Sequence, residues 1–145
     1  MKHPGEGPRV VQPEGWPRPR GYANGLLVPA GHDLLFLAGQ IGWDATERLV
    51  DGGFVAQFEQ ALRNVAELVE AAGGSVEHIV RLTMYCVDKR QYLADLEGVG
   101  RAYRAVLGRH FPVMAMVEVA ALVEDGALIE IEATAALPPR GQEEG

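Results

Sequence analysis

The stretch from Phe111 to Ala136 (FPVMAMVEVAALVEDGALIEIEATAA) constrains the fold most, because it holds the longest β-type alternation of the chain. Side chains of residues 113–122, and again of 128–135, alternate between two sides, which is the period of two expected for strands in a sheet. Asp125-Gly126 lies between the two segments and is a turn signal. The stretch therefore predicts a β-hairpin.

Carboxylates interrupt one side of each of these two segments. Glu130 and Glu132 share a side with Leu128 and Thr134, and Glu118 follows two methionines. A carboxylate buried on its own shifts its pKa or finds a partner. The mixed face is therefore predicted to be solvated, to be bonded within a subunit interface, or to form a site, and Glu118 and Glu132 are candidates for interface bonds to a neighbouring chain.

The first half of the chain predicts two strands, a loop and a helix. Apolar runs at 25–31 and 33–42, separated by a short polar turn, indicate a second β-hairpin. Residues 42–53 lack periodicity and indicate a surface loop. Apolar residues then recur at helical spacing over 54–72, and Gly73-Gly74 supplies a residue suited to a left-handed cap.

The second half continues with a strand and another helix before the stretch described first. Residues 75–78 indicate a capped turn, β-branched and aromatic residues predict a strand over 79–87, and a second amphipathic helix is predicted over 89–107. The order is ββαβαββ, which indicates an α+β domain with two helices on one face of a mixed sheet. The opposite face is rich in apolar residues and has no cover, so we expect subunits to pack their sheets together in a closed homo-oligomer.

Length and composition indicate how the chain is organised. The 145 residues suggest one domain. Prolines crowd residues 1–20, which predicts a loosely ordered lead-in, followed by a single domain over 21–138 and a polar tail over 139–145. No apolar run approaches the length of a membrane span and the lead-in does not resemble a signal peptide, so we expect a cytoplasmic protein with no membrane partner.

Several chemistries are disfavoured by the residue types present. The net charge of −7 argues against nucleic acid as a partner. The four histidines stand apart without metal-ligand spacing, and no phosphate-binding loop is present, so neither a metal nor another cofactor is predicted. The single cysteine, Cys86, lies in an apolar strand pattern and is interpreted as a core thiol rather than a nucleophile.

Residues 22–136 resemble the YjgF or Rid (reactive intermediate deaminase) family, which is also known as endoribonuclease L-PSP. The likeness rests on several motifs in order: AGQIG, LRNVAELVEAAGGS, HIVRLTMYCVD, YRAVLG and the stretch described first. It implies a chorismate-mutase-like fold that trimerises through its sheets into a barrel. It also implies a small-molecule cleft between subunits, in which enamines or imines such as 2-aminoacrylate are hydrolysed to an oxo acid and ammonia.

The resemblance also implies a set of site residues. Glu130 matches the glutamate that holds the hydrolytic water, and Tyr22 and the Ala38-Gly39-Gln40 segment match substrate-lining positions. The family's carboxylate-binding arginine corresponds to Met114, a neutral side chain without a hydrogen-bond donor. Arg90, at the rim of the implied cleft, is a candidate replacement cation, with a solvated helix-start residue as the alternative. Met114 and Met116 are candidates to line an apolar pocket there.

Three functions follow as hypotheses. The favoured one is a Rid-type homotrimer that hydrolyses a small enamine, imine or related carbonyl compound, with activity reduced or altered by the absence of the arginine. The second is a non-catalytic trimer that binds a small ligand in the same cleft. The third, an endoribonuclease, is opposed by the acidic charge, since it would depend on a local cluster such as Arg101, Arg104 and Arg109.

Overall fold

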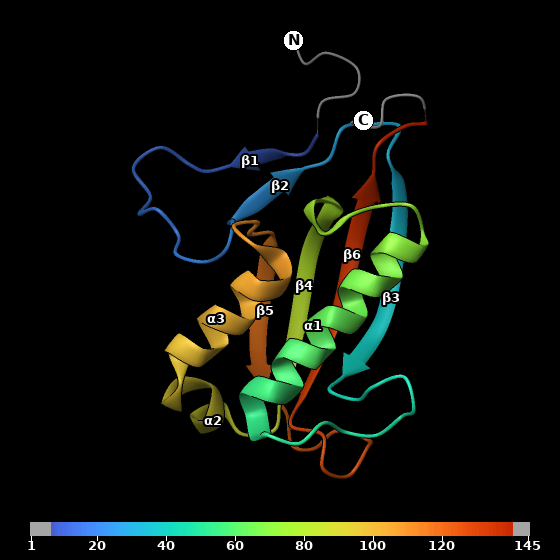
Figure 1. Ribbon diagram of the computed structural model, residues 1–145. Coiled ribbons are helices and arrows are strands. Elements are labelled where there is room, and N and C mark those ends of the chain that lie inside the picture. The colour runs from blue at the N-terminus through green and yellow to red at the C-terminus, as the bar shows by residue number, and fades with distance from the viewer. Residues whose placement is uncertain (1–6, 141–145) are drawn as a thin grey trace.

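The computed structural model describes residues 7–140 and places a layer of helices against one face of a four-stranded sheet (Figure 1). The sheet has the strand order β3-β6-β4-β5. The helices on its inner face are α1 and α3, and the opposite face carries no helix (Figure 1). This α+β arrangement fits the predicted chorismate-mutase-like fold. The bounds are β1 (Arg9–Val11), β2 (Gly25–Leu27), β3 (Asp33–Ile41), α1 (Gly53–Ala71), η1 (Val76–His78), β4 (Ile79–Cys86), α2 (Lys89–Ala94), α3 (Leu96–Leu107), β5 (Val113–Glu118) and β6 (Ile129–Leu137).

The predicted hairpin between residues 113 and 135 is wrong, although both of its strands exist. β5 pairs with β4 in parallel, after the crossover through α2 and α3, while β6 lies between β3 and β4 and runs antiparallel to both. β5 also ends at Glu118, four residues before the predicted end. The alternation of side chains predicts which residues lie on each face of a strand, but it does not predict with which other strand it pairs. Gly126 does adopt the positive φ expected of a turn residue, within the longer connection.

The predicted hairpin of residues 25–42 is also wrong. β2 pairs with β1, not with β3, and forms a separate two-stranded sheet. Its partner, Arg9–Val11, lies in the segment for which the prolines predicted little regular structure. These three residues are free of proline and include two β-branched valines, which favour an extended conformation.

The helices follow the predicted periodicity with one interruption. The first predicted helix is α1, and the predicted capped turn is η1. The second predicted helix is divided at Asp95 into α2 and α3. The Asp95 carboxylate accepts a hydrogen bond of 2.9 Å from the Gly98 amide. Asp is a favoured helix N-cap, so Asp95 begins a new helix, α3, although the amphipathic pattern continues through it.

The two faces of β6 have opposite character. Its odd-numbered residues 129–135 are buried against the helices, whereas Glu130, Glu132 and Thr134 lie on the open face and are partly exposed. The sidedness predicted from the alternation is therefore confirmed for this strand. Within residues 7–140 no helix has the length and apolar character needed to cross a membrane.

Candidate functional site

The open face of the sheet combines apolar edges with a polar centre. On β3, Leu34 is 57% exposed and Phe36 is 74% exposed, and Val117 on β5 is also exposed. β4 and β6 lie between these edges and contribute polar side chains to the face: Arg81, Thr83, Tyr85, Glu130, Glu132 and Thr134. An apolar surface of this kind surrounding titratable groups is typical of an interaction or ligand-binding surface.

Glu130 and Gly39 are brought together near one end of this face. The pairing between β3 and β6 shifts between Leu37 and Gln40, so Ala38 and Gly39 form an irregularity in β3. A Cβ atom at position 39 would lie 2.7 Å from Cδ of Glu130, so the carboxylate packs directly over the bare glycine. Gln40 donates a hydrogen bond of 3.0 Å to the Ala38 carbonyl oxygen. The structure thus groups four of the sequence-predicted site residues, Ala38, Gly39, Gln40 and Glu130, and Glu130 is partly exposed.

Tyr85 and Glu132 form a second pair on the same face. The Tyr85 hydroxyl donates a 2.6 Å hydrogen bond to Oε1 of Glu132. This bond raises the pKa of Tyr85, with additional contributions from burial and from the negative charges of Glu132 and Glu130. Tyr85 is in register with Glu130 across β4 and β6. The sequence analysis missed this pair, because its residues are 47 positions apart and only the register of the strands unites them.

Glu118 and Glu132 were predicted as candidates for bonds to a neighbouring chain. Both have partners within their own chain: Glu132 accepts from Tyr85, and Glu118 accepts a hydrogen bond of 2.9 Å from the Lys89 amide. Cys86 is fully buried and burial raises the pKa of its thiol, as expected for a core residue.

Arg90 is bound to an acid of its own. Its guanidinium group forms two hydrogen bonds to the Asp88 carboxylate, at 2.9 and 3.0 Å, while its side chain is 85% exposed. These bonds lower the pKa of Asp88 and raise that of Arg90. Asp88 also caps α2 by accepting from the Arg90 amide. This geometry agrees with the alternative of a solvated residue at a helix start.

Met114 and Met116 lie on the helix side of β5. They are in register with Leu82 and Met84 and pack against the buried core. Glu130 is on the other face, so within one chain neither methionine shares a site with it. Among residues 7–140 no group of three or more potential ligands is arranged to hold a metal ion, and His3 falls outside that range.

Tyr22 lies near the beginning of β5 rather than near Glu130. Its neighbour Ala23 donates a backbone hydrogen bond of 3.1 Å to the Pro112 carbonyl oxygen. Tyr22 is 42% exposed and lines a cavity that Phe111 and the segment before β2 also line. The predicted site residues are therefore divided between two ends of the sheet: the Gly39 and Glu130 group, and the Tyr22 and Met114 region.

Comparison with known proteins places this geometry among related folds. The family model described as Endoribonuclease L-PSP matches residues 21–137. The human protein 2-iminobutanoate/2-iminopropanoate deaminase is 36% identical over 119 residues, which cover 81% of each chain. The crystal structure of YyfB of Yersinia pestis, a Rid family protein of unknown function, has 31% identity and a TM-score of 0.79, covering 91% of this chain and 100% of that one. RidA of an Antarctic Psychrobacter has 31% identity and a TM-score of 0.63, covering 89% and 99%.

Proposed function

Because the chain belongs to the Rid, or endoribonuclease L-PSP, family, we propose that it hydrolyses a small 2-imino acid or the enamine tautomer of one. The products are the 2-oxo acid and ammonia. The observation that carries the proposal is the carboxyl group of Glu130, a partly exposed residue, packed over Gly39 on the open face of the sheet.

Glu130 supplies the acid and base chemistry of this reaction. Its carboxylate takes a proton from water as the water oxygen bonds to the carbon of the protonated imine, and the electron pair of the C=N π bond moves to nitrogen to give a carbinolamine. The carboxyl group then returns this proton to the amino nitrogen. As the C–N bond breaks and ammonia leaves, the carbinol hydroxyl group gives its proton to the Glu130 carboxylate, which releases it to solvent, and the carbinol oxygen becomes the carbonyl oxygen. A positioned acid or base contributes about 10²–10⁴-fold to such a step.

The proposed cleft joins two copies of the chain. Within one chain Glu130 and Met114 lie on opposite faces of the sheet, and the open face carries exposed Leu34 and Phe36. Packing of these faces against neighbouring copies would bury the apolar edges and surround the Glu130 carboxylate with residues of a second subunit. This is the homotrimer that the sequence predicts.

The assembly gives a direct prediction. We expect light scattering at low micromolar concentration to return about three times the chain mass of 15.7 kDa. Phe36→Glu places a charge on the most exposed apolar side chain of the open face and should shift the particle toward monomer. Val123→Glu is the control, because Val123 is fully exposed outside the sheet. A folded wild-type monomer would contradict both the assembly and the shared cleft.

The absence of an arginine at position 114 favours a second candidate, a trimer that binds a small ligand without hydrolysing it. Met114 offers no donor to a substrate carboxylate, and charge-assisted hydrogen bonds contribute about 1.5–3 kcal/mol. Ammonia release from a panel of imines generated in situ by an amino-acid oxidase separates the two candidates. Ligand binding without ammonia release would favour the second.

Position 114 provides a gain-of-function prediction. Met114→Arg should raise the rate of 2-iminopropanoate hydrolysis about tenfold or more, equivalent to about 1.4 kcal/mol of transition-state binding. Met114 is half-buried on the edge strand β5. The apolar part of an arginine side chain can therefore replace the methionine there, while the guanidinium group reaches solvent. Met114→Gln adds a neutral donor of similar length and should not reproduce the gain. An inert Met114→Arg protein that remains folded and assembled would show that the site has diverged beyond this position.

A further inference from the structure

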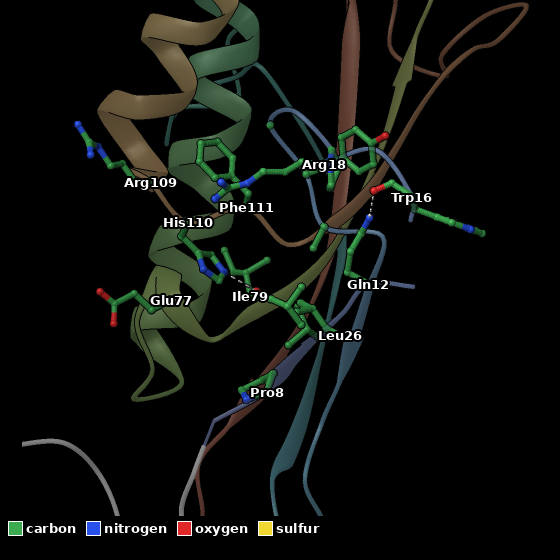
Figure 2. A pocket seen from close by; sticks show the side chains of 16 residues that line it. Pro8, Gln12, Trp16, Arg18, Leu26, Glu77, Ile79, Arg109, His110 and Phe111 are labelled. Carbon is green, nitrogen blue, oxygen red and sulfur yellow. Dashed lines mark hydrogen bonds between the residues drawn. The ribbon is translucent and has the colours of Figure 1, made fainter. Parts of the chain in front are cut away.

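A cavity of about 920 Å³ lies between the segment before β3 and the end of the main sheet where β4 and β5 begin (Figure 2). One wall is the segment of residues 8–26, here called the arm, and the opposite wall includes Ile79 and Phe111. Its volume is within the range of about 300–1,000 Å³ typical of small-molecule sites. Among its lining residues, the sequence analysis named Tyr22 as substrate-lining and Arg109 as part of a basic cluster, but it did not predict the cavity itself.

Hydrogen bonds hold the arm in place. Gln12 accepts a bond of 2.8 Å from the Asn24 side chain and donates one of 3.1 Å to the Pro17 carbonyl oxygen, which ties both ends of the arm loop together. Pairing of β1 with β2 adds backbone bonds within the arm, and the backbone bond from Ala23 to Pro112 attaches the arm to the residue before β5.

The opposite wall is also fixed before any ligand arrives. The Phe111 ring stacks on the Tyr103 ring with centroids 5.5 Å apart and an interplanar angle of 4°. The Tyr103 hydroxyl donates to the His110 carbonyl oxygen at 2.7 Å, and Nε2 of His110 donates to the Ile79 carbonyl oxygen at 2.6 Å. A cavity with two fixed walls loses little entropy on binding a ligand.

The lining combines aromatic rings with one cation directed across the space. Trp16 is 60% exposed, and Tyr22 and Phe111 also keep accessible surface. The Arg18 side chain extends toward the Phe111 ring, whereas the charged ends of Arg109 and Glu77 point away from the cavity (Figure 2). Arg18 makes no side-chain hydrogen bond or ion pair with any residue of the described chain, 7–140. Its guanidinium group is therefore available for a planar anion.

We propose that this cavity binds the carboxylate and ring of an aromatic 2-imino acid, or of the aromatic 2-oxo acid that its hydrolysis yields, with Arg18 as the carboxylate-binding residue. The inference rests on the proposed function and names its substrate class. Within one chain this cavity and Glu130 lie at opposite ends of the sheet, so hydrolysis of the bound imino acid would use the Glu130 carboxylate of a neighbouring copy. Phe111 precedes Met114 by three residues, so the cavity lies at the same end of β5 as the position where the family's arginine is absent. Arg90, the other cation considered, is already bound to Asp88.

Binding of the oxo acid tests the proposal without relying on catalysis. Calorimetric titration of the wild-type protein with phenylpyruvate should give saturable binding at least about tenfold tighter than with phenylacetone, which lacks the carboxylate, or with pyruvate, which lacks the ring. Arg18→Met should weaken phenylpyruvate binding about tenfold and leave phenylacetone binding unchanged. Arg20→Met is the matched control, because Arg20 belongs to the same segment but does not line the cavity. Equal affinity of wild type and Arg18→Met for phenylpyruvate would overturn the proposal.

A second measurement locates the ligand in the unmodified protein. Phenylpyruvate should shift the amide NMR signals of residues around the cavity, such as Trp16 and Phe111, and shifts confined to the Gly39 and Glu130 region would overturn the proposal. The outcomes for the two proposals are distinct. Hydrolysis of 2-iminopropanoate without phenylpyruvate binding would reject the aromatic site and retain the hydrolase, whereas Arg18-dependent phenylpyruvate binding without any imine hydrolysis would retain the site and reject the hydrolase.

Discussion

Replacing Glu130 with glutamine should lower the rate of imine hydrolysis about 100-fold or more, the usual scale for a positioned acid or base. The amide keeps the size of the side chain but cannot take a proton from water at neutral pH. Glu130 is partly exposed, and its side chain makes no hydrogen bond with any residue from 7 to 140. The substitution should therefore leave the fold and the assembly intact. The effect should therefore fall on kcat, measured with 2-iminopropanoate generated in situ.

Glu132→Gln is the matched control for this substitution. Glu132 lies two residues further along β6 on the same face, and its amide replacement can still accept the hydrogen bond from Tyr85. We expect its rate to remain within about threefold of wild type, because Glu132 transfers no proton in the proposed reaction and its bond with Tyr85 is kept. Equal rates for wild type and Glu130→Gln would reduce Glu130 to an interface residue.

The helices and the faces of the central strand could be predicted from the sequence because they depend on local periodicity. The buried odd-numbered side of β6 and the whole of α1 follow from spacing that any short window displays. Strand partners could not be predicted in the same way. β6 contacts β3 and β4, which precede it by about 50 residues or more, and nothing in the alternation distinguishes these partners from β5. The break at Asp95 could have been predicted, because Asp is a common N-cap residue. The continuous hydrophobic stripe of residues 89–107 instead favoured a single helix.

The residues of the candidate site also differ in whether the sequence alone could reveal them. Gly39 and Glu130 were matched by resemblance to a family, and the structure shows them in contact. The Tyr85–Glu132 pair and the Arg18 cavity were missed, because each depends on tertiary placement of residues far apart in sequence. Arg18 stands in a proline-rich segment whose composition suggested a loose lead-in, yet its side chain extends across a formed cavity (Figure 2). Exposed arginines and aromatic residues become informative once a cavity is known to unite them.

The contact between Gly39 and Glu130 predicts a second large effect on catalysis. A methyl group at position 39 would overlap Cδ, Cγ and Oε2 of Glu130, at 2.7, 2.8 and 2.9 Å from the added Cβ. These atoms belong to the free end of a flexible side chain, so Gly39→Ala should displace the carboxylate rather than distort the sheet. A misplacement of about 1 Å can cost about 10²-fold in rate. We expect a loss of this size in kcat, with thermal unfolding changed by no more than a few degrees.

The double variant Gly39→Ala with Glu130→Gln distinguishes displacement of Glu130 from any other effect of the methyl group. If alanine acts by moving the carboxylate, the double variant should be about as slow as Glu130→Gln, because displacing a side chain that no longer transfers a proton costs nothing further. Losses that multiply, to about 10⁴-fold, would mean that Gly39 acts independently, for example by giving the substrate close access to the β3 backbone. Because the two outcomes differ by about two orders of magnitude, single-turnover rates of the four proteins would decide whether Gly39 serves to position Glu130.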